Sequence, residues 1–132
     1  MEASELIKRY NKGERDFQGV DLEGADLRAA DLKRANLEWA HLERAHLEGA
    51  HLERAHLEGA DFDFSVWPLW CGSFDVFVDM DLVYQLSLHI CKLNNDSSEF
   101  KKIKKFLIPY ANKFHRIGKD VEAIPVVVQR KR

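Results

Sequence analysis

The chain is 132 residues long, carries a formal net charge of −2 and contains two cysteines. This length accommodates one ordinary domain or a short repeat array with a small additional unit, and two cysteines are too few for a disulfide framework. No apolar run approaches membrane-spanning length, and the N-terminus lacks the basic start and apolar stretch of a signal peptide. We therefore expect a soluble, cytoplasmic protein.

Residues 1–14 have the pattern of a short helix. Ser4 is a candidate N-cap and Gly13 is a stop signal. Leu6, Ile7 and Tyr10 share one side of this helix. We expect it to be an N-terminal capping helix that covers one end of the repeats that follow, because an open backbone edge would invite aggregation.

Residues 15–64 repeat with a period of five. A large apolar residue occupies every fifth position, and Ala stands two residues before most of them. This period matches neither the 3.6 residues of a helix nor the alternation of a strand. It fits a strand-like step followed by a turn, so that stacked coils form a solenoid with these residues along its axis. The inward positions are Phe17, Leu22, Leu27, Leu32, Leu37, Leu42, Leu47, Leu52, Leu57 and Phe62.

The pentapeptides ADLRA, ADLKR, ANLEW, AHLER and ADFDF resemble the pattern A(D/N)Lxx of the pentapeptide-repeat family. The resemblance implies a β-solenoid, namely a right-handed quadrilateral parallel β-helix with four pentapeptides per coil. One departure is His at positions 41, 46, 51 and 56, where the family usually has Asp or Asn. At these positions an imidazole replaces the group that would tie down the turn.

The four histidines are spaced like the ligands of a metal site, but a square coil would separate them. Consecutive pentapeptides lie about a quarter-turn apart, so the four imidazoles point four ways and cannot share a metal. Their neighbours are residues twenty apart, stacked about 4.8 Å away, which places His41 between Asp21 and Asp61. We expect these columns to satisfy surface hydrogen bonds, and we expect no metal site and no cofactor.

Acidic side chains gather on two adjacent faces of this coil. Residues 16–64 hold twelve acidic and five basic side chains, a net of −7. Two and a half coils span about 12 Å, so the charge density of about one per 1.7 Å is close to that of duplex DNA. Solubility of the solenoid is the simpler explanation, yet like charges stacked one coil apart repel. The candidate partner-binding residues are Asp16, Asp21, Glu23, Glu38, His41, Glu43, Glu58, Asp61 and Asp63.

The repeat register breaks after residue 64. Residues 65–78 are rich in aromatic side chains, which we expect to plug the last coil. Residues 79–132 have helical signals, with a first helix capped by Asp79 or Asp81. Its apolar stripe would comprise Val83, Leu86, Ile90 and Leu93.

A second helix would follow in the same helical region. Asp96 and Glu99 have the spacing of a capping box, and Pro109 should kink the helix or end it near Ile108. Its apolar side is large for a monomer, so we expect a homodimer, with packing inside one chain as the alternative. The resemblance supports a dimer, because some pentapeptide-repeat DNA mimics dimerise through C-terminal helices. The candidate dimerisation residues are Phe100, Ile103, Leu107, Tyr110 and Phe114.

No motif predicts catalysis. A glycine-rich phosphate loop and a nucleophile elbow are both missing from the sequence. A metal site built from Cys71, Cys91, His89 and His115 is disfavoured. His89 and Cys91 are two residues apart on a predicted helix, so their side chains face different ways. We therefore expect no catalytic residue and no small-molecule substrate.

The family resemblance suggests a binding function, since members that confer quinolone resistance are DNA mimics that occupy the DNA-binding site of gyrase. We expect a non-enzymatic, DNA-mimic-like inhibitor or modulator of a DNA-handling protein, either a topoisomerase or a phage-defence nuclease such as a CRISPR effector. The alternative is a general protein-interaction scaffold whose helical C-terminal domain makes the contacts. Direct nucleic-acid binding by the C-terminal part, residues 65–132 with a net charge of +4, is a weaker idea.

Overall fold

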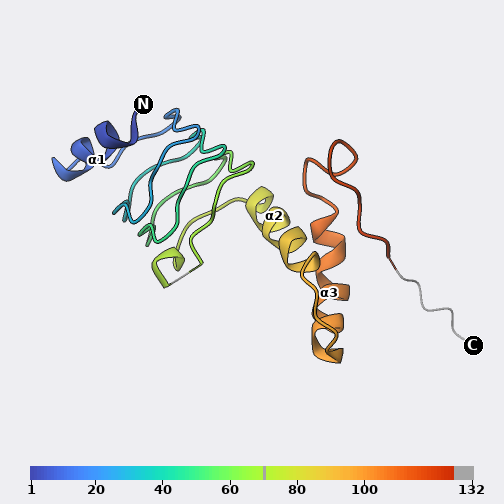
Figure 1. The fold of residues 1–132 in the computed structure, drawn as a ribbon. Coiled ribbons are helices and arrows are strands. Elements are labelled where there is room, and N and C mark those ends of the chain that lie inside the picture. Colours follow the sequence, from blue (N-terminus) through green and yellow to red (C-terminus); the bar gives the residue numbers. More distant parts are fainter. Residues whose placement is uncertain (70, 127–132) are drawn as a thin grey trace, which may run out of the picture. The chain divides into compact units, whose positions relative to one another are not determined.

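The computed structural model describes residues 1–69 and 71–126. The chain divides into two compact units, Met1–Asp79 and Met80–Arg132. The first unit contains a stack of coils, the helix α1 (Ala3–Asn11) and the short 3-10 helix η1 (Cys71–Ser73). The second unit contains the helices α2 (Met80–Cys91) and α3 (Ser98–Ala111) (Figure 1).

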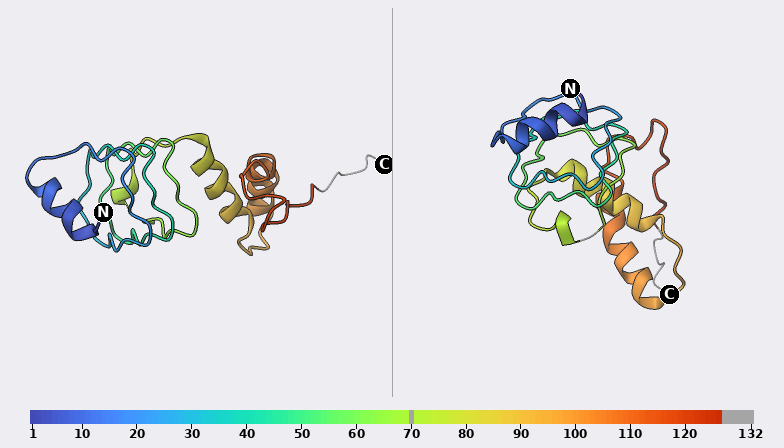
Figure 2. Two further views of the ribbon diagram at one scale, coloured as in Figure 1. Left: turned by 90° about the horizontal axis from the view of Figure 1, so that it is seen from above. Right: turned by 60° about the vertical axis from the view of Figure 1, so that its left-hand side comes forward.

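The coils of the first unit repeat every twenty residues. Parallel β-bridges join residues twenty apart, beginning with Asp16 and Asn36, so four pentapeptides complete one coil as expected. The amides of the inward residues from Phe17 to Leu57 donate to carbonyls of the next coil, as from Leu22 to His41 at 2.8 Å. The bridges stay isolated because a turn interrupts the extended backbone on every side of the coil. Figure 2 shows the coils stacked side by side.

Each side of a coil ends in a β-turn. The amide of Ala25, for example, donates to the carbonyl of Leu22 at 3.0 Å. The third residue of each turn has a positive φ, which suits Gly24 but is also imposed on Arg34 and Trp39, both with φ of 60°. Such a conformation costs about 1–2 kcal/mol for a residue with a Cβ. Coil stacking therefore overrides local backbone preference at several corners.

The core of the first unit is the axis of the coils. The leucines from Leu22 to Leu57 are at most 2% exposed, and the alanines from Ala35 to Ala55 are at most 1% exposed. These are the two inward columns that the period of five predicts. Burying a leucine side chain stabilises a fold by about 1.5–3 kcal/mol, so this repeated column is the main source of stability for the array.

Helix α1 lies at the start of the coil stack (Figure 2). Leu6 is fully buried, and the Tyr10 hydroxyl donates to the carbonyl of Lys33 at 2.9 Å. The expected N-cap is wrong. The cap residue is Glu2, because its carbonyl accepts the amides of Glu5 and Leu6. The Glu2 side chain makes no capping bond. The helix thus starts earlier than Ser4 suggests.

Residues 65–78 do not form the separate aromatic plug that the sequence suggested. Val66 pairs with His46 and Phe77 pairs with His56, so this segment follows the path of a further, less regular coil. The carbonyl of Gly72 also accepts the amide of Leu52, at 2.8 Å. The unpaired backbone of the preceding coil is satisfied by continued pairing, which explains why the chain keeps its coiled path after the sequence repeat has ended.

Among the described aromatic side chains of this last coil, Trp67 is half-buried and the rest are exposed. The Trp67 ring packs edge-on against Phe62, with 5.7 Å between ring centroids. Phe64, Phe74 and Phe77 are exposed by 58%, 63% and 49%. Trp70 lies outside the described residues. A plug made jointly by these aromatics is therefore wrong.

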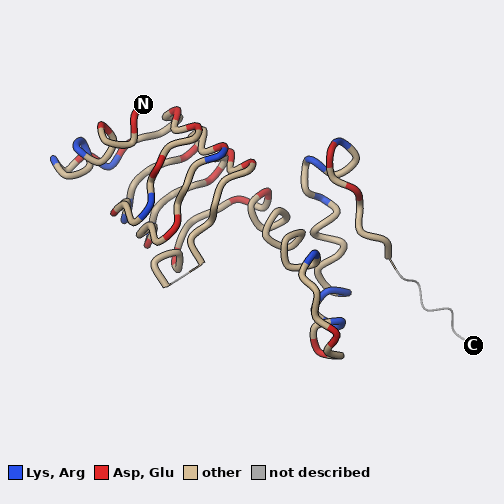
Figure 3. Tube along the Cα trace, in the orientation of Figure 1, with Lys and Arg blue, Asp and Glu red and all other residues tan. Residues whose placement is uncertain are grey.

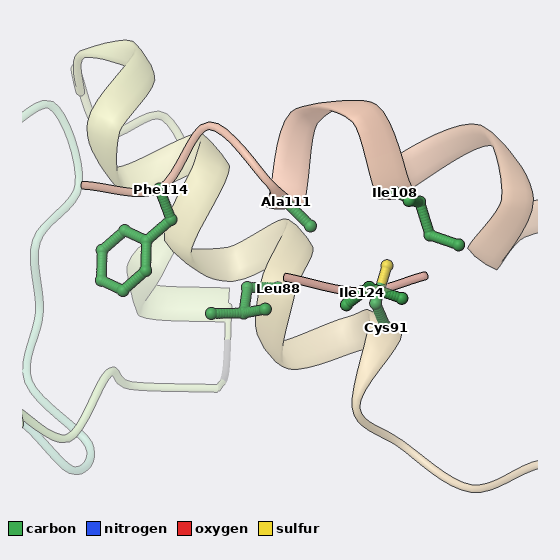
Figure 4. Close-up of a cluster of buried hydrophobic side chains, with 6 residues drawn as sticks. All are labelled: Leu88, Cys91, Ile108, Ala111, Phe114 and Ile124. Atoms are coloured by element: carbon green, nitrogen blue, oxygen red, sulfur yellow. The ribbon is translucent and has the colours of Figure 1, made fainter. Parts of the chain in front are cut away.

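The second unit is built on the packing of α2 against α3 (Figure 4). The side chain of Asn112 fixes the segment that follows, because its Oδ1 accepts the amide of Ile124 at 2.8 Å and its Nδ2 donates to the Ile124 carbonyl at 3.0 Å. Ile124 is thereby held in the core of the unit. The core residues are Leu88, Cys91, Ile108, Ala111, Phe114 and Ile124.

Several details of the predicted helices are wrong. Val83, Ile90 and Leu93 of the predicted α2 stripe are exposed, because α3 packs on a neighbouring side of α2 that carries Leu88 and Cys91.

The predicted start and end of α3 also differ from the structure. Its N-cap is Ser97 in place of Asp96, and the Ser97 hydroxyl accepts the amide of Phe100 at 3.1 Å. Pro109 does not end α3, which runs to Ala111. The ring lies so near the helix end that the bond it removes disrupts little.

No helix among residues 1–69 and 71–126 combines the length and the apolar character that crossing a membrane requires.

Candidate protein-binding surface

The repeat fixes the outward side chains through bonds at the start of each turn. The Asp before the inward Leu accepts the amide of the residue after that Leu, as Asp21 does from Glu23 at 3.1 Å. Asp61 makes the same bond to Asp63 at 2.9 Å. These bonds hold the outward carboxylates Glu23 and Asp63 at defined places on the coil.

The histidines replace this bond with a contact to a glutamate. The His41 Nδ1 lies 3.5 Å from Glu43 Oε1, and the His56 Nδ1 lies 3.3 Å from Glu58 Oε1. The bridges confirm the predicted stacking of His41 between Asp21 and Asp61. Its side-chain contact is nevertheless with a glutamate of its own coil, because that side chain emerges two residues along on the same side.

The first acidic column consists of Glu23, Glu43 and Asp63. The amide of Gly24 donates to the Glu43 carbonyl at 2.7 Å, which fixes the stacking of the first two members. Arg44, which is not among the predicted site residues, also lies here. Its Nη1 binds Glu23 Oε1 at 3.0 Å, and its guanidinium lies 5.1 Å from the centre of the Phe64 ring. Its position directly after Glu43 is the feature of the sequence that could have placed a basic group at this column. One basic group therefore offsets part of this column.

The second acidic column consists of Glu38 and Glu58. The amide of Trp39 donates to the Glu58 carbonyl at 3.0 Å, so the two glutamates stack one coil apart. Trp39 is 63% exposed and its ring lies against Gly59, where an added Cβ would come within 2.5 Å of a ring atom. This tryptophan is also absent from the predicted site residues, although the glycine twenty residues further on signals space for a large ring beside it. The column thus combines two carboxylates with an exposed indole.

The nine predicted binding residues all lie on the outside of the coils. Figure 3 shows acidic positions recurring along the stack. The exposed members are Asp16, Asp21, Glu23 and His41, and the half-buried members are Glu38, Glu43, Glu58, Asp61 and Asp63.

The remaining two faces mix charges of both signs. Arg28 donates to Asp26 through Nε at 2.8 Å and through Nη2 at 2.6 Å. This pairing, together with the Arg28 amide, lowers the pKa of the Asp26 carboxyl to about 2. On the other mixed face the amide of Arg34 donates to the Glu53 carbonyl at 3.0 Å, which stacks Lys33 next to Glu53. These faces offer a partner little net charge.

The predicted dimerisation residues do not form one surface. Phe114 is 4% exposed in the core of the second unit, and Leu107 packs against that core. Ile103 and Tyr110 are 47% and 38% exposed, and Phe100 is half-buried. The five residues were assigned to one side, but α2 occupies part of that side. Phe114 is therefore unavailable to a second copy in this structure.

A different part of α3 is open to solvent. Phe106 is 68% exposed, and its ring centroid lies 5.8 Å from that of Tyr110. A groove of about 540 Å³ elsewhere on this unit is lined by lysines of α3 and by apolar side chains. Its lining residues are Lys101, Lys104, Lys105, Ile108, Pro109, Ile124, Pro125 and Val126.

Potential metal ligands converge at one place on the described coils. The four histidines stay on separate columns, as predicted. Potential ligand atoms of Glu38, His56 and Glu58 nevertheless lie within 4.8 Å of one another. Separation of the four histidines does not prevent His56 from meeting two glutamates, which is why the spacing of the histidines alone predicts no metal site. Cys91 is a core side chain, and burial raises the pKa of its thiol.

The geometry defines the first unit as a β-solenoid with charged outer faces. The family model described as pentapeptide repeats matches residues 16–49 and 30–63, with eight copies. Residues 16–63 therefore belong to the pentapeptide-repeat family. The family implies a right-handed quadrilateral β-helix for this region, and the bridges at a spacing of twenty agree with four sides per coil.

Two solved structures similar to this chain are pentapeptide repeat proteins. One is from Nostoc Pcc 7120, with 24% identity over 59% of this chain and 96% of that chain, and a TM-score of 0.32. The other is from the Arabidopsis thaliana thylakoid lumen, with 25% identity and a TM-score of 0.31. That match covers 61% of this chain and 59% of the other. No curated protein sequence matches this chain.

Proposed function

We propose that the pentapeptide-repeat coils bind a DNA-handling protein through the two acidic columns, as a non-enzymatic mimic of duplex DNA. The observation that carries the proposal is the stacking of like charges. Glu38 stands one coil from Glu58, and Glu23 stands one coil from Glu43, although the mixed faces show that this scaffold accepts a basic residue at the equivalent place. Stacked like charges destabilise a fold, so their retention supports a binding role.

The charge density of the whole stack supports the same proposal. Because the coiled path continues through residue 79, the relevant segment is residues 16–79, with fourteen acidic and five basic side chains and a net of −9. Slightly more than three coils span about 15 Å at the spacing of paired strands. The resulting density, about one charge per 1.7 Å, is close to that of duplex DNA. The extra coil lengthens the mimic without diluting it.

The exposed Trp39 gives this surface an anchor for a partner. Tryptophan and arginine are enriched among the residues that dominate binding energy at protein interfaces. DNA-binding sites are rich in Arg and Lys, which can stack on an indole face as well as pair with carboxylates. Trp39 beside Glu38 therefore suits a basic partner surface better than a column of carboxylates alone would.

The experiment compares two charge-matched variants of the full chain. Glu23→Gln with Glu43→Gln removes two of the three negative charges of the first acidic column, and Glu48→Gln with Glu53→Gln removes the same charge from the mixed faces. Each protein is immobilised and used to capture partners from a bacterial lysate over a salt series. We expect a DNA-handling protein to be captured by the wild type and by the mixed-face variant, and to be lost from the column variant. Capture should fall steeply with salt, since the attraction is coulombic.

Self-association is a second proposal, favoured by the exposed aromatic side of α3. We propose a homodimer in which Phe106 and Tyr110 contact a second copy, in place of the five-residue stripe predicted from sequence. The Phe106 and Tyr110 rings already lie side by side, and paired exposed aromatic side chains are typical of protein contact surfaces. A general scaffold in which the second unit makes the contacts is the alternative function, and capture that survives neutralisation of both acidic columns would favour it.

A further inference from the structure

The second acidic column carries a group of three side chains that the DNA-mimic proposal does not explain. Glu38, His56 and Glu58 each offer a metal-ligand atom, and these atoms lie within 4.8 Å of one another. All three side chains are half-buried, so the group is partly sheltered but still reachable from solvent.

The imidazole of His56 is held in place from two sides. Its ring stacks on Phe77, with 4.5 Å between centroids and 12° between the ring planes. Its Nδ1 lies 3.3 Å from Glu58 Oε1. A ring restrained in this way loses little further freedom when it binds an ion, which favours binding over a mobile surface histidine.

The two carboxylates lack a basic partner. Throughout residues 1–69 and 71–126, no lysine or arginine forms an ion pair with Glu38 or Glu58. The Oε2 atom of Glu58 is buried and accepts no hydrogen bond from the described part of the protein, as is also true of Glu43 and Glu53, so the second unpaired carboxylate of Glu38 is what sets this group apart. Two stacked negative charges and an unsatisfied buried oxygen are costly, and a bound cation would relieve both.

The other three His–Glu pairs of the coils provide internal comparisons. Their Nδ1 to carboxylate distances are all 3.5 Å, for His41, His46 and His51. The residue stacked one coil earlier is Lys33 for Glu53 and Arg28 for Glu48. The residue stacked one coil before Glu43 is a second glutamate, Glu23, and Arg44 binds Glu23 at 3.0 Å. Among these four described pairs, only the His56–Glu58 pair is stacked on a carboxylate, that of Glu38, that has no basic partner.

We propose that Glu38, His56 and Glu58 form a binding site for a divalent transition-metal ion such as Zn²⁺. One imidazole and two carboxylates are ligands that Zn²⁺ accepts, and water would complete the coordination. Bonds of about 2.0–2.2 Å place ligand atoms roughly 3–4 Å apart, so modest side-chain rotations close the present spacing. The site goes beyond partner binding, since it requires the imidazole and the juxtaposition of these two carboxylates, and not the overall charge.

The test is calorimetric titration of the full chain with Zn²⁺ at about pH 7.5, since metal binding competes with protons for its ligands and weakens in acid. We expect one ion per chain, with affinity at least tenfold lower in His56→Ala and in Glu58→Gln. Glu38→Lys should have the same effect, because it places a lysine one coil before Glu58, as Lys33 stands one coil before Glu53. His51→Ala and Glu53→Gln are the matched controls and should bind like the wild type.

A second measurement follows the histidine ring nitrogens by NMR during the same titration. Coordination should move the signals of His56 while those of His41, His46 and His51 stay in place. Absence of stoichiometric binding would overturn the proposal, as would equal losses in the His51 and His56 variants. Loss of Zn²⁺ binding would leave the partner-capture experiment unaffected, because that comparison uses Glu23 and Glu43.

Discussion

Replacing Leu42 by Ala tests the inward column at the middle of the array. Leu42 is fully buried, and its amide donates to the carbonyl of Asp61 at 2.8 Å, so coil packing holds the backbone around it. The change removes three carbon atoms, worth about 2.4 kcal/mol at about 0.8 kcal/mol each, before the cavity is counted. With the cavity, the free energy of unfolding should fall by about 2–5 kcal/mol.

Leu69→Ala is the matched control, because Leu69 belongs to the same unit and is 93% exposed. The identical chemical change should cost under about 0.5 kcal/mol there. Urea unfolding is followed by tryptophan fluorescence, which reports the first unit because all three tryptophans lie in it. Equal losses in the two variants would refute the inward assignment.

Three further predictions concern the turns, the charged pair and α3. Asp61→Ala removes the side-chain acceptor of a turn amide held at 2.9 Å and should cost about 0.5–1.5 kcal/mol in thermal melts, more than His46→Ala, whose turn lacks that bond. The folded pKa of Asp26, about 2, lies below its ordinary value, so its stabilising contribution is complete above about pH 4 and is lost as pH falls through about 2. Arg28→Ala should raise that pKa toward its ordinary value in a carboxyl NMR titration. Phe106→Glu should convert a dimer of about 31 kDa, twice the chain mass of 15.3 kDa, into a monomer in sedimentation runs.

Each of these has an outcome that counts against it. A His46→Ala variant less stable than Asp61→Ala would mean that the histidine turns are the better-anchored ones. An unchanged Asp26 pKa after removal of Arg28 would assign its lowering to another group. A wild-type mass near 15.3 kDa at micromolar concentration would remove the dimer altogether. Leu107→Glu is a poor probe of the dimer, because Leu107 packs against the core and its loss would disturb the fold.

The coils were predictable from sequence because their information is local and repeated. A large apolar residue at every fifth position leaves few backbones that bury all of them, and the spacing of twenty then follows from the four-sided coil. The nine outward residues could be placed for the same reason. What the period could not show was the corner residue, so Arg44 and Trp39 were missed although each lies directly after a predicted site residue.

The helical unit was harder to predict because its core depends on which side of each helix meets the other. On α2 two overlapping apolar stripes are available, and the one with Leu88 and Cys91 is buried by α3 while the one with Ile90 is left outside. The path of residues 65–78 was missed for a related reason. Its backbone pairing with the preceding coil needs no sequence repeat, so the loss of the repeat did not mark the end of the coil.

The central proposal is that the acidic columns occupy a DNA-binding site, and displacement of DNA tests it most directly. The captured partner is bound to a fluorescently labelled DNA duplex, and this protein is added while anisotropy is followed. We predict that the wild type and the Glu48→Gln, Glu53→Gln variant release the duplex competitively, and that the Glu23→Gln, Glu43→Gln variant requires at least about tenfold more protein, a loss of about 1.4 kcal/mol. A ternary complex, in which the partner holds the duplex and this protein together, would contradict the account.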